Sequence, residues 1–281
     1  DHLVTGQTPF RAVTLDATFA VADGHDSLRS GVERLTDEVE AAAADGAEIL
    51  VISHGAVDAD RAPIPSVLAV GAAHHRLIAL KRRSDVSLVA LADDARDTHF
   101  FAVLVGYGAD AVCPRLALET LADWADNSDD DTTGPVAQGH FFDAVEAGVL
   151  KILSKMGIST LDSYRGAQIF EVIGLSDEVV DLCLRGTPSV VGGVTWDHLG
   201  LDAIELHASS ALVSPGYYRV RNKGEYHAHS KDVVQALNDL TLVKEPTTAP
   251  SDLALQDMTA AHLLQRAING ESYDLYESFR A

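Results

Sequence analysis

The sequence predicts an α/β fold, because short extended apolar segments alternate with amphipathic helical segments along the chain. Residues 10–21 and 47–52 have strand character, and residues 28–45 between them have helical periodicity. The connections between successive strands are long enough for parallel pairing, which needs crossovers of about a dozen residues or more. Both a barrel and an open sheet fit this pattern, and the sequence alone does not separate them.

The first three elements each have a local cause. Apolar and polar side chains alternate over residues 10–21, as they do in a half-buried strand. Asp26 or Ser27 is placed to cap the following helix, in which apolar side chains recur every three or four residues until Gly46. Residues 47–52 are almost entirely apolar, and they predict a buried strand.

The same alternation continues through the rest of the chain. Pro63 and Pro65 predict an extended loop and the start of the next helix. Ser176 is expected to cap a short helix. Helices are expected over residues 66–80, 98–105, 114–124, 136–156, 177–184, 196–211 and 232–240, extended segments over 86–91, 109–113 and 168–174, and irregular structure over 217–229.

The composition is that of a globular chain. Its 281 residues suffice for one large domain or two small ones, and 47% of them are hydrophobic. No apolar run reaches the ~18 residues of a membrane helix and no signal peptide is visible, so a cytoplasmic chain is expected. Asp1 in place of Met indicates a piece cut from something longer. Cys113 and Cys183 are too few for a disulfide framework or a cluster site, and each is expected to be a small buried side chain.

The net charge of −21, from 42 acidic and 21 basic residues, argues against nucleic acid and anionic membranes as partners. One interpretation is an acidic docking surface. The favoured one is a hydrated surface adapted to high salt, because the acidic residues are spread along the chain. Residues 123–131 form the one acidic run, and a solvated loop is expected there.

Two histidine pairs could suggest a metal site. His74 and His75 are neighbours on a predicted helix and therefore point about 100° apart, which makes a poor ligand pair. His227 and His229 alternate as strand residues do, but no nearby cysteine or carboxylate set completes a site. Polar contacts at a helix end are the favoured interpretation of the first pair, and no metal is expected at either.

Three other patterns are weak signals of chemistry. Residues 106–108 lack the third glycine of a dinucleotide fingerprint. Residues 192–193 could offer backbone N–H groups to a phosphate, but a plain turn is favoured. Asp58, Asp60 and Arg61 follow a strand, where barrel enzymes place reacting groups. Because a Pro-x-Pro segment follows them, a salt-bridged structural loop is favoured.

The densest polar cluster lies in residues 151–175, KILSKMGISTLDSYRGAQIFEVIGL. At KMGIST a helical pattern gives way to an extended one, with Gly157 at the break, where a helix end favours a residue tolerant of positive φ. A polar turn at the end of a barrel or sheet strand is predicted, and the residue types alone name no reaction. The cluster consists of Lys155, Met156, Gly157, Ser159, Tyr164, Arg165 and Gln168.

Four sequence blocks resemble the large subunit of glutamate synthase. They are KMGIST followed by SYRGAQIFE, VDADRAPIPSVLA followed by GAAHHRLI, GYGADAVCPRLALETLAD, and GGV with KGEYH. They occur in the family's order over roughly residues 10–230. The resemblance implies the family's central domain, which lies between a glutamine amidotransferase domain and an FMN-binding barrel. It favours an incomplete, rudimentary (β/α) barrel over an open sheet.

The resemblance also implies a function. The whole enzyme makes glutamate from glutamine and 2-oxoglutarate, in glutamate biosynthesis and ammonia assimilation. This chain would be its structural and coupling domain, inactive alone and without a cofactor of its own. FMN and an iron–sulfur cluster are implied for the full-length enzyme, with the electron donor left open. The implied partners are the neighbouring amidotransferase and FMN-binding domains and a small subunit or ferredoxin, and the cluster around Gly157 becomes a candidate interface or ammonia-tunnel wall.

The same resemblance sets the expected domain boundaries. They are 1–243 for the central domain, 244–252 for a proline-containing linker, and 253–281 for the truncated start of the FMN-binding domain. The chain departs from the family pattern at residues 53–55, 113–115 and 228–229, so no residue role is carried over to those loops.

Two alternatives from other classes stay open. A free-standing barrel enzyme would bind FMN or a phosphorylated substrate, but no glycine-rich loop that cradles a phosphate is visible. An interaction module with an acidic face would use the carboxylates for docking.

The charge leads to a first prediction. Because like charges at this density repel, and screening acts within about 10 Å at 0.1 M salt, the melting temperature should rise between low and molar KCl. Thermal unfolding followed by circular dichroism measures this. A melting temperature that is flat or falls with salt would contradict it and favour the acidic docking surface.

Overall fold

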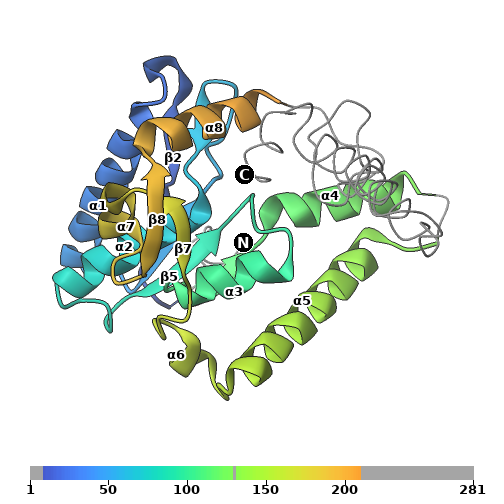
Figure 1. Cartoon of the computed structure of the whole chain (residues 1–281). Coiled ribbons are helices and arrows are strands. Elements are labelled where there is room, and N and C mark those ends of the chain that lie inside the picture. Colours follow the sequence, from blue (N-terminus) through green and yellow to red (C-terminus); the bar gives the residue numbers. More distant parts are fainter. Residues whose placement is uncertain (1–8, 129–130, 210–281) are drawn as a thin grey trace, which may run out of the picture. The chain divides into compact units, whose positions relative to one another are not determined.

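The computed structural model describes residues 9–128 and 131–209, and it confirms the α/β prediction (Figure 1). Its main sheet is parallel and has the strand order β1-β3-β5-β6. The strands are β1 (Ala12–Asp16), β3 (Ile49–Ser53), β5 (Ser87–Leu91) and β6 (Ala111–Cys113). Within the described residues the sheet does not close on itself, which agrees with an incomplete barrel.

Three helices connect these strands and cover one face of the sheet: α1 (Ser27–Ala44), α2 (Ser66–Ala79) and α3 (Thr98–Gly106). The register aligns Leu15, Ile52 and Ala90 across the sheet, so their side chains share a face. All three are buried among the apolar stripes of the helices. Burial of this face supplies most of the apolar contact that holds the sheet.

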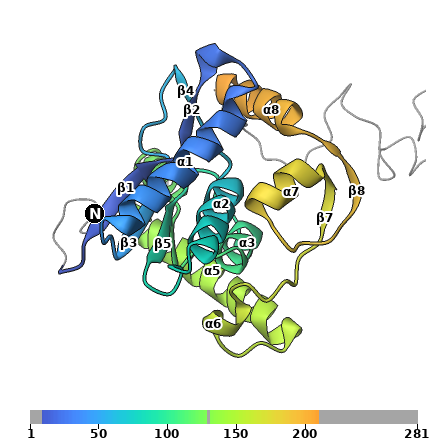
Figure 2. The same ribbon diagram turned by 90° about the vertical axis from the view of Figure 1, so that its left-hand side faces the viewer.

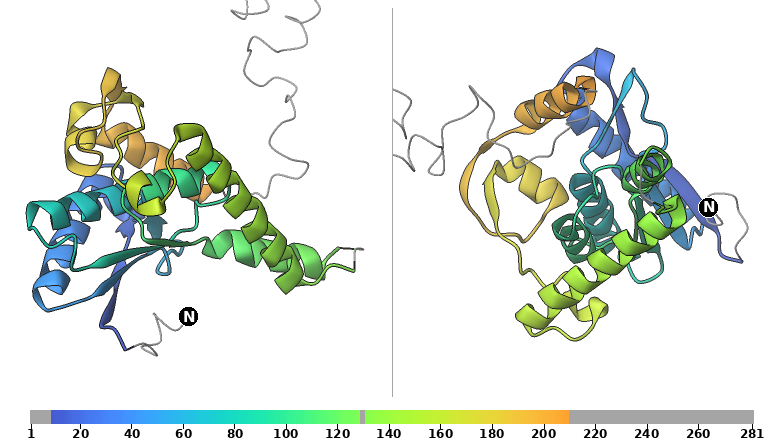
Figure 3. Two further views of the ribbon diagram at one scale, coloured as in Figure 1. Left: turned by 90° about the horizontal axis from the view of Figure 1, so that it is seen from below. Right: turned by 90° about the vertical axis from the view of Figure 1, so that its right-hand side faces the viewer.

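The remaining elements extend this body. A long pair, α4 (Arg115–Asp126) and α5 (Gly134–Met156), lies side by side and projects beyond the sheet (Figure 3). The chain then forms α6 (Leu161–Tyr164), β7 (Val172–Leu175), α7 (Asp177–Cys183), β8 (Ser189–Val194) and α8 (Trp196–Ala208). Strands β7 and β8 pair in parallel, α7 packs on α2, and α8 packs on α1 (Figure 2).

Several predicted boundaries hold. Helix α1 ends as expected before Gly46, which has a φ of +83°, and α5 ends before Gly157, which has a φ of +70° in the left-handed region. Cys183 is fully buried, as expected of a small apolar side chain. Ser176 stands at the start of α7, but its hydroxyl makes no capping bond among the described residues.

The predicted strand over residues 10–21 is wrong in detail, because it breaks at Ala17. The amide of Thr18 donates to the Asp16 carboxylate, and the chain bends into β2 (Thr18–Ala20). Strand β2 pairs with β4 (Arg61–Pro63), which lies in the predicted loop. Then η1 (Val21–Asp23) leads into α1. A tertiary pairing of this kind leaves no local signal in the sequence.

Two other predictions are corrected. Residues 192–193, where a plain turn is expected, lie inside β8 instead, and Gly193 has a φ of +146° there. The extended segment over residues 168–174 becomes a strand only at Val172, because Gln168 takes a φ of +53° and turns the chain first.

Some predictions fall outside the described residues: the irregular segment 217–229 with His227 and His229, the helix 232–240, the linker 244–252 and the segment 253–281. No helix in the described part of the chain is both long and apolar enough to cross a membrane.

The contact between α2 and α7 yields a second prediction. A Cβ built on Gly71 would lie 2.2 Å from the carbonyl oxygen of Cys183, so Gly71→Ala must push the two backbones apart. We expect a loss of roughly 1–3 kcal/mol in the free energy of unfolding, measured with urea.

The matched control is Gly139→Ala on α5, where a Cβ would meet nothing within 4 Å. It should leave stability unchanged or raise it by up to about 1 kcal/mol through helix propensity. Equal effects of the two substitutions would show that the α2–α7 contact is looser than described.

Candidate functional site

The carboxyl edge of the main sheet, where barrel folds carry their chemistry, is filled by internal bonds. His54 follows β3 and is 2% exposed; its Nε2 lies 2.7 Å from the carbonyl oxygen of Ile64, and its Nδ1 accepts the amide of Asp93 at 3.1 Å. With Nδ1 accepting, Nε2 is the nitrogen that donates to the Ile64 carbonyl oxygen. Asp94 accepts both the amide and the hydroxyl of Ser66, and it thereby fixes the start of α2.

Arginines close the same edge. Arg115 makes a two-pronged pair with Asp93, and Arg61 pairs with Asp16 and donates to the Thr18 hydroxyl at 2.7 Å. The predicted salt-bridged loop at Arg61 is therefore present, but its carboxylate partner is Asp16 and not its sequence neighbours Asp58 and Asp60. These side chains hold the loops in place through ion pairs and hydrogen bonds that they already form within the chain.

The structure separates the predicted cluster around Gly157 into two parts. Its first four members, Lys155, Met156, Gly157 and Ser159, are exposed at the end of α5. Tyr164 is 1% exposed and packs against Phe170, in a small core beside α3. The turn follows a helix and not a strand, so that part of the prediction is wrong. A new helix follows the turn for a local reason: the Thr160 hydroxyl accepts the amide of Ser163 and thereby caps the start of α6.

Arg165 anchors the turn to the main sheet. One end of its guanidinium pairs with Asp110, and the other pairs with Asp162 at 2.9 Å. Asp110 precedes β6, accepts the amide of Leu88 at 2.7 Å, and also pairs with Arg83 at 2.9 Å. A single carboxylate thus links two arginines and a strand.

Arg83 carries this network to α2. Its Nε donates to Nδ1 of His74 at 2.9 Å, and its terminal nitrogens donate to the carbonyl oxygens of Val86 and Gly108, both at 2.7 Å. Burial, together with the charges of Arg83, His75 and Arg165, lowers the pKa of His74 to about 4, against an opposing effect of Asp110. Because Nδ1 accepts, the remaining proton of the neutral ring is on Nε2.

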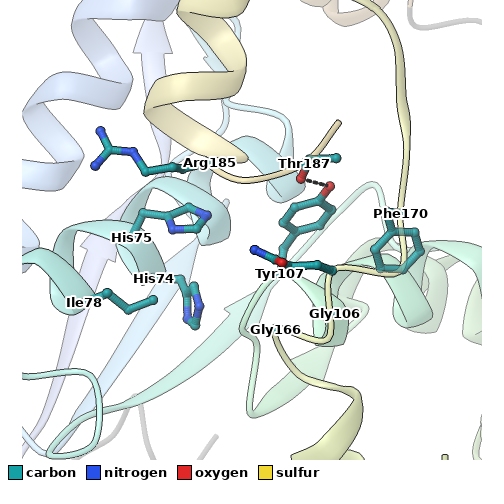
Figure 4. Close-up of a pocket in the computed structure, with 10 residues that line it drawn as sticks. His74, His75, Ile78, Gly106, Tyr107, Gly166, Phe170, Arg185 and Thr187 are labelled. Carbon is teal, nitrogen blue, oxygen red and sulfur yellow. Dashed lines mark hydrogen bonds between the residues drawn. The ribbon is translucent and has the colours of Figure 1, made fainter. Parts of the chain in front are cut away.

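Beside this network lies a cavity of about 180 Å³ (Figure 4). His74 and His75 project into it from α2, facing Tyr107 at the end of α3 and Phe170 (Figure 4). The rings of Tyr107 and Phe170 stack with their centroids 5.5 Å apart, and the Tyr107 hydroxyl lies 2.8 Å from that of Thr187. Its lining residues are His74, His75, Ile78, Gly106, Tyr107, Gly166, Gln168, Phe170, Arg185 and Thr187.

Sequence reasoning named Gln168, His74, His75 and Gly106 separately but did not bring them together. Gly106 ends a helix, so it belongs to no dinucleotide loop, and a Cβ there would lie 2.3 Å from the Phe170 ring. Among the described residues, the one group of three potential metal ligands is exposed and consists of His25, Asp26 and Asp197. His74 and His75 are not part of it, and the polar contacts expected at this helix end are present.

The two cysteines and the cavity beside Tyr107 do not fit the two cofactors that the resemblance implies for the whole enzyme. The common iron–sulfur clusters are held by four cysteines, and the chain has 2, of which Cys183 is buried with a pKa raised by burial. The cavity beside Tyr107 is smaller than the ~300 Å³ at which sites for larger ligands begin, so it would not hold a flavin.

The fold and these sites define an α/β domain with an incomplete parallel barrel whose carboxyl edge is closed by its own side chains. The chain matches the family described as "Glutamate synthase central domain" over residues 1–176, and it belongs to that family.

Known relatives agree with this assignment. The chain is 38% identical over 242 residues to "Glutamate synthase [NADH]" of Schizosaccharomyces pombe, covering 82% of this chain and 12% of the relative. It is 41% identical over 244 residues to the chloroplastic "Ferredoxin-dependent glutamate synthase" of Oryza sativa subsp. japonica, covering 80% and 15%. It is 35% identical over 240 residues to "Glutamate synthase [NADPH] large chain" of Bacillus subtilis, covering 81% and 16%. The chain therefore spans less than a fifth of the length of these relatives.

The lowered pKa of His74 gives a third prediction. In the unfolded chain the ring takes up a proton near its ordinary pKa of 6.5, whereas in the fold it stays neutral down to about 4. The stability due to neutral His74 is thus complete above the unfolded pKa, and it is lost as the pH falls toward 4. His74→Asn keeps an acceptor for Arg83 but cannot titrate, so its free energy of unfolding should fall less between about pH 7 and pH 5 than that of the wild type.

Urea unfolding at a series of pH values measures this difference. His140→Asn, which replaces an exposed histidine on α5, serves as the control and should keep the wild-type slope. Identical slopes for the wild type and His74→Asn would rule out His74 as the source of the pH dependence.

Proposed function

We propose that this chain is the central section of a glutamate synthase large subunit, and that it acts as a structural and coupling domain. In this proposal it links ammonia released from glutamine to the reductive amination of 2-oxoglutarate, as part of glutamate biosynthesis and ammonia assimilation. The family membership and the relatives' names support this function. The chain itself carries no catalytic site in this proposal.

The observation that carries the proposal is the state of the carboxyl edge. His54, Asp93 and Asp94 are polar groups at the place where a barrel enzyme would use them, and each is bonded to the chain's own backbone or side chains. A buried polar network with every member satisfied gives rigidity and a single arrangement. Such an edge suits a domain that holds other sites in position.

Exposed apolar side chains support contact with neighbouring domains. Ile173 and Val190 on the β7–β8 sheet are 82% and 84% exposed, and Met156 beside the turn is 51% exposed. Parallel strands are usually covered on both faces. We propose that the amidotransferase and FMN-binding domains of the same enzyme cover such surfaces, and that the turn around Gly157 forms part of the ammonia path.

Other parts of the whole enzyme belong to the same proposal. FMN and an iron–sulfur cluster are assigned to regions other than this chain, and a small subunit or a ferredoxin is a further partner. The relatives' names include NADH, ferredoxin and NADPH, so they do not select an electron donor. The domain boundaries at residues 243 and 252 and a cytoplasmic location stay predictions.

The turn gives the fourth prediction. Gly157 is exposed and left-handed, so Gly157→Val adds roughly 1–2 kcal/mol of backbone strain and displaces the turn. In the full-length enzyme this should impair the coupling of glutamine hydrolysis to glutamate formation while sparing flavin binding. The measurement is ammonia released into solution against glutamate formed, with flavin absorbance as a second reading.

Two control variants distinguish an effect of the turn at Gly157 from a general effect of backbone strain. Gly157→Asn tolerates the left-handed conformation and should stay coupled. Gly46→Val places the same strain at the end of α1, where a Cβ also meets nothing within 4 Å, and it too should stay coupled. Tight coupling and a normal glutamate yield in Gly157→Val would show that the turn matters only for local folding.

A further inference from the structure

The starts of α1 and α8 meet at one place on the surface of the domain, because α8 packs on α1 (Figure 2). His25 and Asp26 immediately precede α1, and Asp197 lies in the first turn of α8. Among residues 9–128 and 131–209, these three side chains form the one group of potential metal ligands. The group is separate from the closed carboxyl edge and from the cavity beside Tyr107.

The backbone holds this group in position without help from its charges. A Cβ built on Gly200 would lie 2.0 Å from the carbonyl oxygen of His25, so the two backbones are in direct contact there. Trp196, the first residue of α8, is 4% exposed and packs in the main core. The Ser27 hydroxyl donates to the carbonyl oxygen of Ala20 at 2.8 Å and fixes the start of α1. A group placed in advance in this way loses less entropy when it binds a ligand.

The three candidate ligand atoms are spaced as they would be around one small metal ion. His25 Nδ1 lies 3.0 Å from a carboxylate oxygen of Asp26 and 3.8 Å from one of Asp197, and all three atoms lie within 4.8 Å of one another. Nitrogen and oxygen ligands lie about 2.0–2.2 Å from zinc, which places neighbouring ligands of a tetrahedral site about 3.3–3.6 Å apart. The observed separations lie on either side of this range, so small side-chain rotations suffice.

The two carboxylates of the group lack a permanently charged partner. In the described part of the chain, neither Asp26 nor Asp197 forms an ion pair with a lysine or an arginine. Arg29 lines the same hollow, but it already pairs with two glutamates. Their contact with His25 is an ion pair only when that ring carries a proton. Two carboxylates this close repel one another, and a cation between them removes the repulsion.

The ligand types select the class of metal. Calcium and magnesium take oxygen ligands, whereas an imidazole nitrogen with carboxylate oxygens suits zinc and similar transition metals. Metals bind the neutral form of imidazole, so an ion would occupy the place of the proton between His25 and the carboxylates. Three protein ligands leave the fourth position of a tetrahedral zinc site to water.

We propose that His25, Asp26 and Asp197 bind a divalent transition-metal ion of the zinc class, which links the start of α1 to the start of α8. The ion is bound through His25 Nδ1 and one oxygen of each carboxylate. The site is independent of the proposed role in ammonia transfer, and its test needs only this chain.

Zn²⁺ alone is the probe, titrated calorimetrically into the 281-residue chain without an affinity tag. Molar KCl screens weak binding to scattered carboxylates, so one saturable site per chain should stand out. His25→Asn removes the nitrogen ligand and Asp197→Asn removes a charged one, so each should weaken binding roughly tenfold or more. Mg²⁺ at equal concentration should not compete, because it prefers sites made only of oxygen ligands.

Two matched variants serve as controls. His140→Asn removes an exposed histidine from α5, and Asp177→Asn removes an exposed carboxylate from the first turn of α7. Both should bind Zn²⁺ within about twofold of the wild type, since surface charges away from the ion contribute little. Absent Zn²⁺ binding, or unchanged affinity in both His25→Asn and Asp197→Asn, would overturn the site. An equal loss in Asp177→Asn would assign the binding to the acidic surface as a whole, and competition by Mg²⁺ would overturn the class of metal.

Thermal unfolding gives a second reading that also checks folding. A ligand that binds only the folded chain stabilises it, so saturating Zn²⁺ should raise the melting temperature of the wild type and of both controls. His25→Asn and Asp197→Asn should melt close to the wild type without Zn²⁺, because both side chains are exposed, and should gain less from it. An equal gain in these two variants would contradict a link between α1 and α8 through the ion.

Discussion

The carboxylate of Asp110 is the contact on which the arrangement of this domain depends most. It stands just before β6 and accepts the amide of Leu88, so it fixes how β6 meets β5. It also holds Arg83 and Arg165, which come from separate parts of the chain. Two guanidinium groups brought this close would repel one another without the shared negative charge. The main sheet, the end of α2 and the turn after α5 are therefore joined at one point.

The consequences of that contact reach the cavity. Because Asp110 orients Arg83, the Nε of Arg83 faces His74 and imposes a neutral ring with a defined proton position. Arg165, held at its other end by Asp162, carries the chain past Gly166, whose amide donates to the carbonyl oxygen of Gly106. Phe170 then reaches the face of Tyr107. The cavity walls are thus placed by charge pairing first and by aromatic packing second.

Much of the fold was predictable because its signals are local. The apolar stripe of α1 and the left-handed glycines Gly46 and Gly157 depend on near neighbours in the chain, and they lie where the pattern placed them. The break at Ala17 was not predictable, because the amide of Ala17 bonds to the carbonyl oxygen of Ser53, which is distant in sequence. Strand β8 was missed because its two glycines, Gly192 and Gly193, favour a turn when only local preference is considered.

The candidate site was only partly predictable. Residues 155–168 were correctly recognised as rich in polar groups, but composition does not show which of them point inward. For Tyr164 the Thr160 cap decides this, since it starts α6, and that helix turns Tyr164 into the core. The pairing of Tyr107 with Phe170 depends on how two distant segments pack, and no spacing rule contains it. Gly106 was the one available signal, since only a residue without a side chain lets the Phe170 ring lie so close.

The two edges of the main sheet have opposite properties, and this difference has a physical origin. At the carboxyl edge, an acidic group at the end of β1 and one after β5 pair with Arg61 and Arg115, and these pairs hold the loops in place. At the amino edge, Asp110 holds both Arg83 and Arg165, and burial together with nearby positive charges lowers the pKa of His74. Pairs at the carboxyl edge therefore join neighbouring loops one by one, whereas at the amino edge two arginines share one carboxylate. Loss of a single group at the amino edge would leave its partners unpaired, so that edge depends more on one residue than the carboxyl edge does.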